Sequence, residues 1–149
     1  MKDIKINEMG SEVVEGFKCK PKKLDPNKPI MHYKTHIFVC DGERCKKAFG
    51  KDIATFLREL LKELKLNKGS KRIKISRGGC FGACRFRGVI NIYENTRANG
   101  FLENDNLWIK KAHTFTRKEW EEIFLLLSSN KPLEKYLEKE SFIQMKIFE

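Results

Sequence analysis

Two pairs of closely spaced cysteines constrain the fold of this chain more than any other feature. Cys40 and Cys45 form the first pair, Cys80 and Cys84 form the second, and residues 46–79 separate them. The apolar run HIFVC indicates a short buried strand that ends at the first pair, and the alternating residues of KRIKIS predict a strand before the second. Between them, KKAFGKDIATFLRELLKELKL places apolar residues at helical spacing. Because a β-α-β unit has parallel strands, both cysteine pairs are expected at the same edge of the sheet.

The second half of the chain predicts a hairpin and a further helix. GVINIYE at residues 88–94 and LWIKKAH at residues 107–113 read as the two strands, joined by the polar turn NTRANGFLENDN. Thr116 and Glu119 form a T-x-x-E capping box at the start of an amphipathic helix. The predicted fold class is therefore α/β (α+β), with a mixed four-stranded sheet, helices packed on it and the element order β-α-β-β-β-α. This arrangement is typical of thioredoxin-like folds.

One domain and two flanking segments are expected. Residues 1–32 are predicted to be a basic N-terminal extension, because KCKPKKLDPNKP contains prolines that disfavour a helix or a central strand. Residues 33–137 are predicted to form the domain. Residues 138–149 are predicted to be a C-terminal tail, whose apolar alternation suits an added strand or packing on a neighbour. Cys19 lies in the extension and is expected to be an incidental thiol.

The expected compartment bears on what the cysteines do. The N-terminus has no apolar signal region, and no run approaches the ~18 apolar residues of a membrane helix. A cytoplasmic protein without a membrane partner is therefore expected, in which thiols stay reduced and clustered cysteines serve a metal or catalysis.

Four thiolates at this spacing suit either Zn²⁺ or an iron–sulfur cluster. A dithiol redox site is disfavoured because no C-x-x-C motif is present, and a phosphate-binding loop is disfavoured because GGCFGAC lacks G-K-[ST]. Inert buried thiols would leave the two pairs and their glycines unexplained. The x4 and x3 spacings favour ligands that reach two iron atoms, Cys40 and Cys45 on one and Cys80 and Cys84 on the other. The glycines around the second pair would let backbone N–H groups point at the cluster sulfurs.

The same residues carry a resemblance to a known family. The order HIFVC…C, helix, ISRGGCFGAC with its C-x-G-x-C motif, VINIYE, a Trp-containing strand and a final helix resembles the thioredoxin-like [2Fe–2S] ferredoxins over residues 33–137. It is also similar to the small iron–sulfur subunit of respiratory NADH dehydrogenases and of some hydrogenases. The resemblance implies a [2Fe–2S] cluster on Cys40, Cys45, Cys80 and Cys84 in a one-electron carrier that catalyses no reaction itself. A free carrier of this family is commonly a homodimer, whereas a subunit would belong to a larger complex.

The chain departs from the family in its charge and in the residues after the last cysteine. Arg87 and Gly88 stand where the family usually has Gly-Pro, and the turn at residues 95–106 is longer than expected. The net charge is +11, from 31 basic and 20 acidic residues, whereas many ferredoxins are acidic. Acidic redox proteins are therefore the expected partners, and a set of cations flanking the cysteines forms either their docking patch or a solvated rim: Arg44, Lys46, Lys47, Arg77, Arg85 and Arg87.

The positive charge also supports a second interpretation, a zinc-stabilised module that binds nucleic acid or protein. Nucleic acid is the less favoured partner, since the lysines are spread along the chain rather than gathered in one block. The histidines and tryptophans are expected to be structural or surface residues: His32, His36, His113, Trp108 and Trp120.

Overall fold

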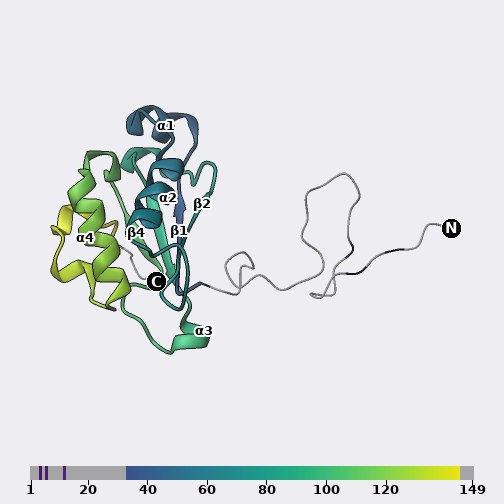
Figure 1. The fold of residues 1–149 in the computed structure, drawn as a ribbon. Coiled ribbons are helices and arrows are strands. Elements are labelled where there is room, and N and C mark those ends of the chain that lie inside the picture. Colours follow the sequence, from purple (N-terminus) through teal and green to yellow (C-terminus); the bar gives the residue numbers. More distant parts are fainter. Residues whose placement is uncertain (1–3, 5, 7–11, 13–32, 145–149) are drawn as a thin grey trace, which may run out of the picture.

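The computed structural model describes residues 4, 6, 12 and 33–144 (Figure 1). Most of the predicted extension at residues 1–32, with Cys19 and His32, lies outside the described residues, as do residues 145–149. The strands of the described part are β1 Thr35–Val39, β2 Ile73–Arg77, β3 Ile90–Glu94 and β4 Leu107–Ile109. Its α-helices are α1 Glu43–Phe49, α2 Ile53–Glu63, α3 Thr96–Asn99 and α4 Arg117–Ser128, and its short 3₁₀ turns are η1 Cys84–Phe86, η2 Ala112–Thr114, η3 Leu133–Lys135 and η4 Lys139–Ser141.

The four strands form one mixed sheet in the order β2-β1-β3-β4. β1 and β2 are parallel, with Val39 opposite Arg77 at their carboxyl ends, and β1–β3 and β3–β4 are antiparallel. The predicted mixed four-stranded α+β class is confirmed. The parallel pair brings the loop after β1 beside the loop after β2, which is where the two cysteine pairs lie.

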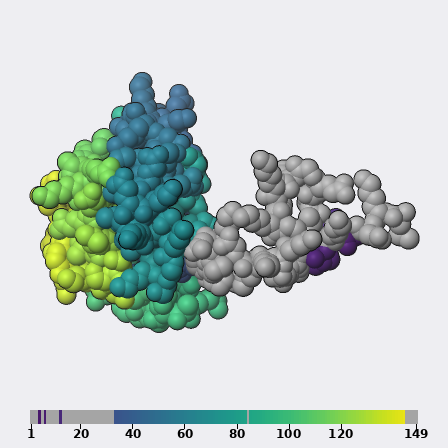
Figure 2. All heavy atoms as spheres, viewed as in Figure 1, coloured from purple at the N-terminus to yellow at the C-terminus, as the bar shows by residue number. Residues whose placement is uncertain are grey.

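The core lies between one face of the sheet and helices α2 and α4 (Figure 1). Alternate residues of β1 and β3, including Ile37 and Ile92, point into this core because successive side chains of a strand face opposite sides. α2 and α4 adjoin in the space-filling view (Figure 2), and an ion pair between Glu63 and Arg117 links them. Each helix contributes an apolar stripe at helical spacing, from Leu57, Leu60 and Leu61 on α2 and from Trp120, Ile123, Phe124 and Leu127 on α4. Within the described residues, no helix combines the length and apolar character needed to cross a bilayer.

The single helix predicted after the first cysteine pair is two helices. Gly50 ends α1 in the left-handed conformation with φ 66°, and its N–H bonds the Lys46 carbonyl. Asp52 then starts α2 by accepting a hydrogen bond from the Thr55 N–H. α2 ends at Glu63, and Leu64 caps it with a backbone N–H that bonds the Leu60 carbonyl. The apolar periodicity runs through both helices, so it did not reveal the break.

The hairpin is shorter than predicted, and the C-terminal segment completes its edge. β4 stops at Ile109, and Lys111 adopts a left-handed φ of 55° two residues later. Ser141 and Ile143 then bond the backbone of the β4 segment, and buried Phe142 bridges Ile109. The segment after residue 137 therefore adds to the edge of the sheet, one of the two expected options. The predicted capping box is present: Thr116 and Glu119 each accept a hydrogen bond from the backbone N–H of the other.

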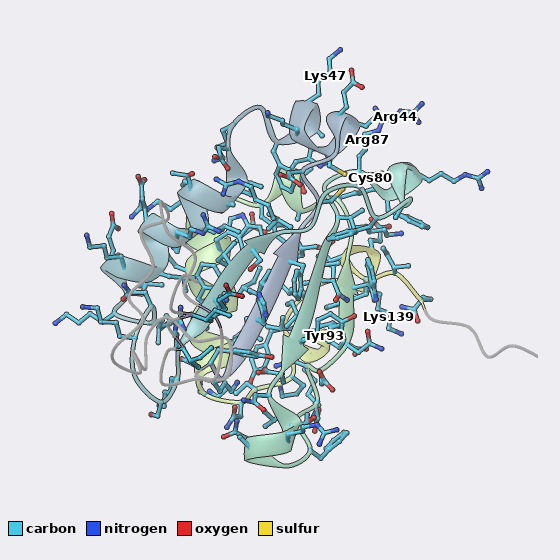
Figure 3. All side chains as sticks on the ribbon, turned by 90° about the vertical axis from the view of Figure 1, so that its right-hand side faces the viewer. Arg44, Lys47, Cys80, Arg87, Tyr93 and Lys139 are labelled. Carbon is cyan, nitrogen blue, oxygen red and sulfur yellow. The ribbon has the colours of Figure 1, made fainter. Side chains whose placement is uncertain are left out.

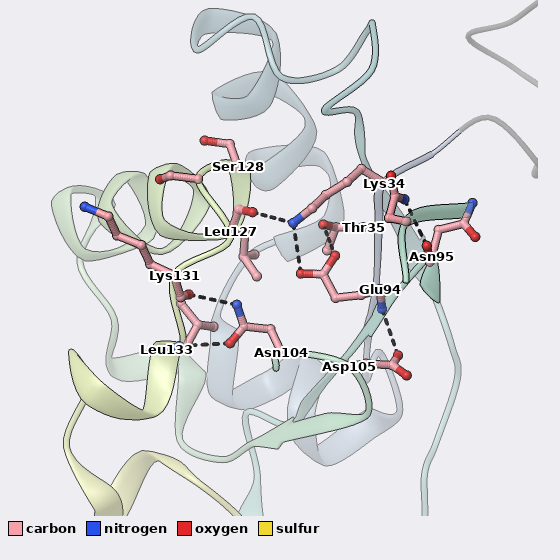
Figure 4. A network of polar contacts seen from close by, with 12 residues as sticks. Lys34, Thr35, Glu94, Asn95, Asn104, Asp105, Leu127, Ser128, Lys131 and Leu133 are labelled. Carbon is pink, nitrogen blue, oxygen red and sulfur yellow. Dashed lines mark hydrogen bonds and ion pairs between the residues drawn. The ribbon is translucent and has the colours of Figure 1, made fainter. Parts of the chain in front are cut away.

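A buried polar network fastens the start of β1 to β3 and α4 (Figure 4). The Lys34 ammonium lies 3.1 Å from a Glu94 carboxylate oxygen and also donates to the Leu127 carbonyl. Thr35 donates from its hydroxyl to the other Glu94 oxygen at 2.6 Å. Burial is the largest effect on Glu94 and raises its pKa, while the bonds from Thr35 and Lys34 act in the opposite direction. The buried Lys34–Glu94 ion pair is therefore stabilised by hydrogen bonds from protein groups, which replace the water that both charges lose on burial.

Gly88 sits where a larger residue has no room. Its φ is +83°, and an added Cβ would lie 2.4 Å from the His113 Nδ1 atom and 2.9 Å from the Ala112 nitrogen. We expect Gly88→Ala to lower the free energy of unfolding by about 2 to 3 kcal/mol, from left-handed strain plus overpacking. Gly50→Ala is the matched control, because Gly50 has φ +66° with nothing within 4 Å of the added Cβ. Its expected loss is about 1 kcal/mol by urea titration, and equal losses would contradict the packing argument.

Candidate metal centre

The structure places the cysteines on two neighbouring loops at one end of the parallel strand pair. Cys40 directly follows β1, Cys45 lies in α1 and Cys80 lies in the loop after β2. Cys40 and Cys45 are buried, whereas Cys80 is exposed at the tip of the molecule (Figure 3). Cys84 begins η1, and its side chain lies outside what the structure describes.

The two cysteine-bearing loops hold each other through their backbones. The Asp41 N–H donates to the Gly79 carbonyl at 3.2 Å, and the Gly79 N–H donates to the Asp41 Oδ1 atom at 2.7 Å. An added Cβ on Gly42 would lie only 3.0 Å from the Cβ of Cys80. Glycine at position 42 therefore permits the approach of Cys80 to the first loop, as expected from the parallel strands.

Backbone N–H groups face the cysteine sulfurs, as the glycines led us to expect. The backbone N–H groups of Phe81 and Gly42 lower the pKa of the Cys40 thiol, and the Gly82 nitrogen lies 3.4 Å from the Cys80 sulfur. Gly82 reaches this position with φ +71°, a conformation that suits glycine. The second loop thus contributes donors as well as a thiol.

Opposing effects act on the Cys40 thiol. Burial is the largest of them and raises its pKa, and the neighbouring Cys45 side chain raises it further. The backbone donors of Phe81 and Gly42 lower the pKa because they stabilise the thiolate. The effect of Cys45 on the Cys40 pKa places the two side chains of the first pair close to each other.

The donor chemistry of this site is that of a sulfur-ligated metal. Cys40 and Cys45 adjoin each other, and Cys80 is on the loop bonded to theirs. Among the described side chains, no group of three or more His, Cys, Asp or Glu stands in metal-binding geometry. The side chain of Cys84 is not among the described side chains. The structure therefore brings the two loops together and describes three of the four thiols. Thiolates with N–H donors suit Zn²⁺ or an iron–sulfur cluster.

Sequence reasoning missed the residues that join the loops. Asp41, Gly42 and Phe81 were not singled out, yet each supplies a contact between the two cysteine loops. An Asp-Gly dipeptide immediately after a predicted strand and its cysteine is the signal that was available for the first two. No sequence pattern could have identified Phe81, because it acts on Cys40 through its backbone N–H, a group that nearly every residue has.

Exposed cations surround the open end of the site. Arg77 is not part of this group, because its guanidinium lies 2.6 Å from the Asp52 carboxylate. Figure 3 shows Arg44, Lys47 and Arg87 at the end of the molecule that carries Cys80, and Lys46 and Arg85 belong to α1 and η1, which contain Cys45 and Cys84. These five residues are exposed and form no ion pair among the described residues: Arg44, Lys46, Lys47, Arg85 and Arg87. We call these five residues the rim cations.

The described histidines and tryptophans are not part of the cysteine site. His36 is buried on β1 and its Nε2 atom lies 2.8 Å from the Ser76 hydroxyl, while burial and the cations Lys74 and Arg72 lower its pKa to about 4. His113 is exposed beside Gly88. Trp120 is in the core, and Trp108 is half-buried against Phe81 with ring centroids 5.6 Å apart.

No protein-family model matches this chain, and a search of curated proteins found no match either. The kinship with thioredoxin-like ferredoxins therefore stays a hypothesis that rests on the pattern of residues 33–137.

Proposed function

We propose that this protein is a one-electron carrier that holds a [2Fe–2S] cluster through Cys40, Cys45, Cys80 and Cys84. The observation that supports it most is the pair of cysteine loops bonded to each other through Asp41 and Gly79, with backbone N–H groups facing the sulfurs. In this proposal Cys40 and Cys45 hold one iron, and Cys80 and Cys84 hold the other. When bound, such a cluster takes up and releases one electron.

The chain's own residues would hold and tune that group. The N–H groups of Phe81, Gly42 and Gly82 stabilise negative charge on the sulfurs, which favours the reduced state and raises the reduction potential. Burial of Cys40 and Cys45 keeps water away from one side of the site. Exposed Cys80 marks the side at which a partner can approach within electron-transfer distance.

The proposal extends to fold family and partners. The domain at residues 33–137 would be a thioredoxin-like ferredoxin module, active in the cytoplasm as a homodimer and without catalytic activity of its own. The rim cations favour redox partners with acidic surfaces, since complementary charge speeds encounter. Cations beside a cluster that carries negative charge also favour its reduction.

Metal and sulfide analysis of anaerobically purified protein tests the proposal. We expect iron and acid-labile sulfide in equal amounts, a brown colour with visible absorption, and an EPR signal that appears on one-electron reduction. A colourless protein that contains zinc in place of iron would contradict the proposal and favour the zinc-stabilised module.

A further inference from the structure

A basic groove lies at the edge of the sheet, away from the cysteine loops. It has a volume of about 690 Å³ and runs beside edge strand β2, between α2 and the segment that connects α2 to β2. Among its described lining residues the only acid is Glu59. The cations that line it are Arg58, Lys62, Lys68, Arg72 and Lys74. Of the cysteines whose side chains the structure describes, Cys40, Cys45 and Cys80, none lines this groove.

The positive charge of the groove is poorly compensated. Within the described part of the chain, Lys62, Lys68 and Lys74 form no ion pair, and Arg58 donates to the Ile75 carbonyl at 2.9 Å rather than to an acid. Burial lowers the pKa of Lys74 most, and the neighbouring cations Arg72 and Arg58 lower it further. The three lysines that form no ion pair within the described residues create a local positive field that attracts a polyanion.

Tyr93 lies on the sheet face opposite α2 and α4 (Figure 3). The strand register places Lys74, His36 and Tyr93 in one row on neighbouring strands β2, β1 and β3, with His36 buried between the other two. Because neighbouring strands lie about 4.8 Å apart, Tyr93 is roughly 10 Å from Lys74. Tyr93 is 39% exposed, and half-buried Phe38 meets it edge-to-face with ring centroids 5.8 Å apart.

We propose that the groove and this sheet face together bind single-stranded nucleic acid. Phosphates would lie along the groove cations, and bases would stack on Tyr93 and Phe38, which project from the two middle strands of the sheet. A cationic groove beside exposed rings is the combination that single-strand binders use, and a four-stranded sheet with aromatic residues on its middle strands is a known stacking platform.

Other occupants fit these features less well. A second copy of the chain packed on this face would bring two sets of groove cations together, and like charges repel. An acidic protein would pair with the groove cations, but it has no bases to stack on the rings of Tyr93 and Phe38. A nucleic-acid duplex would satisfy the charge, but its stacked bases are closed to Tyr93.

Fluorescence anisotropy with a labelled 12-nucleotide oligouridylate tests the proposal on the full chain. We expect binding that weakens with salt, with a log–log slope of about −2 for three phosphate contacts. The duplex of the same length should bind at least about fivefold more weakly, because stacking on one aromatic side chain is worth about that much or more. Equal or tighter binding of the duplex would overturn the proposal.

Matched variants locate the site. Lys62→Glu with Lys68→Glu should weaken binding at least about tenfold and flatten the salt slope. Lys131→Glu with Lys135→Glu makes the same charge change in the segment after α4, on the other side of the molecule (Figure 1), and should have little effect. An equal loss in both variants would show attraction to net charge alone and would refute a defined site.

Tyr93 separates stacking from simple charge attraction. Tyr93→Ala should weaken oligouridylate binding about tenfold, and Tyr93→Phe should restore it, since the ring rather than the hydroxyl stacks. Circular dichroism and the oligomeric state are measured in parallel. Unchanged oligonucleotide affinity in a folded Tyr93→Ala variant, or dissociation of a dimer with affinity unchanged, would contradict the proposal. The outcome does not depend on the proposed cluster, because the described cysteine side chains lie outside the groove.

Discussion

A Cys45→Ser variant is expected to lose nearly all the visible absorption and the reduced-state EPR signal of the proposed cluster. Cys45 is only 2% exposed and lies beside Cys40, so a serine there would put a hydroxyl oxygen where the proposed site needs a soft thiolate. Mutating residues that only hydrogen-bond the metal ligands typically lowers metal affinity roughly 10- to 100-fold. Loss of a ligand itself should therefore lower the iron content at least about tenfold. The measurements are iron and sulfide content and the absorption spectrum after anaerobic purification.

Cys19 provides the matched control for this experiment. Cys19→Ser makes the same chemical change outside residues 33–137, and its iron content and spectrum should equal those of the unchanged protein. The far-ultraviolet circular dichroism of Cys45→Ser should also stay close to that of the unchanged protein. A full cluster spectrum in Cys45→Ser would remove Cys45 from the ligand set and, with it, the proposed pairing of Cys40 and Cys45 on one iron.

Glu94→Ala should lower the free energy of unfolding by about 3 to 5 kcal/mol. The change leaves the Lys34 ammonium buried without its carboxylate, and breaking one partner of a buried ion pair typically costs that much. The Thr35 hydroxyl would lose its acceptor in the same step. Urea titration followed by circular dichroism measures the change.

An exposed ion pair gives the control for Glu94. Glu63 pairs with Arg117 on the surface, where both side chains are more than half exposed. Glu63→Ala should therefore cost less than about 1 kcal/mol. If Glu94→Ala cost no more than Glu63→Ala, the buried network would not anchor β1 to α4 as the structure indicates.

The sequence predicted the parts of the fold that depend on local pattern. Alternation in residues 71–76 and the apolar run at residues 36–40 located β2 and β1 within about one or two residues, and chain order made them parallel. The capping box at Thr116 was also correct. The break at Gly50 was missed because its cause is backbone conformation, and apolar spacing continues across it.

Contacts between distant segments account for the rest. The Asp41–Gly79 bonds form only once Val39 and Arg77 are aligned at the ends of two parallel strands, and no local pattern encodes that alignment. Phe142 reaches the edge of β4 in the same way. The groove cations come from α2 and from residues 68–74, so they look scattered along the chain. They gather only when α2 packs beside β2 in the folded protein.

The bonds between Asp41 and Gly79 bear on how such a protein would be loaded. They join the two cysteine loops through protein atoms of both loops, a backbone carbonyl and a carboxylate. Small zinc domains differ, because there the metal supplies the free energy of folding. In this chain, the core between the sheet and helices α2 and α4 supplies the free energy of folding. Under the proposed function, folding and cofactor acquisition would be successive events, and the folded chain would be a receptor for a preassembled cluster rather than an unfolded precursor. The unchanged circular dichroism expected of Cys45→Ser is the measurement that would show folding before the cofactor binds.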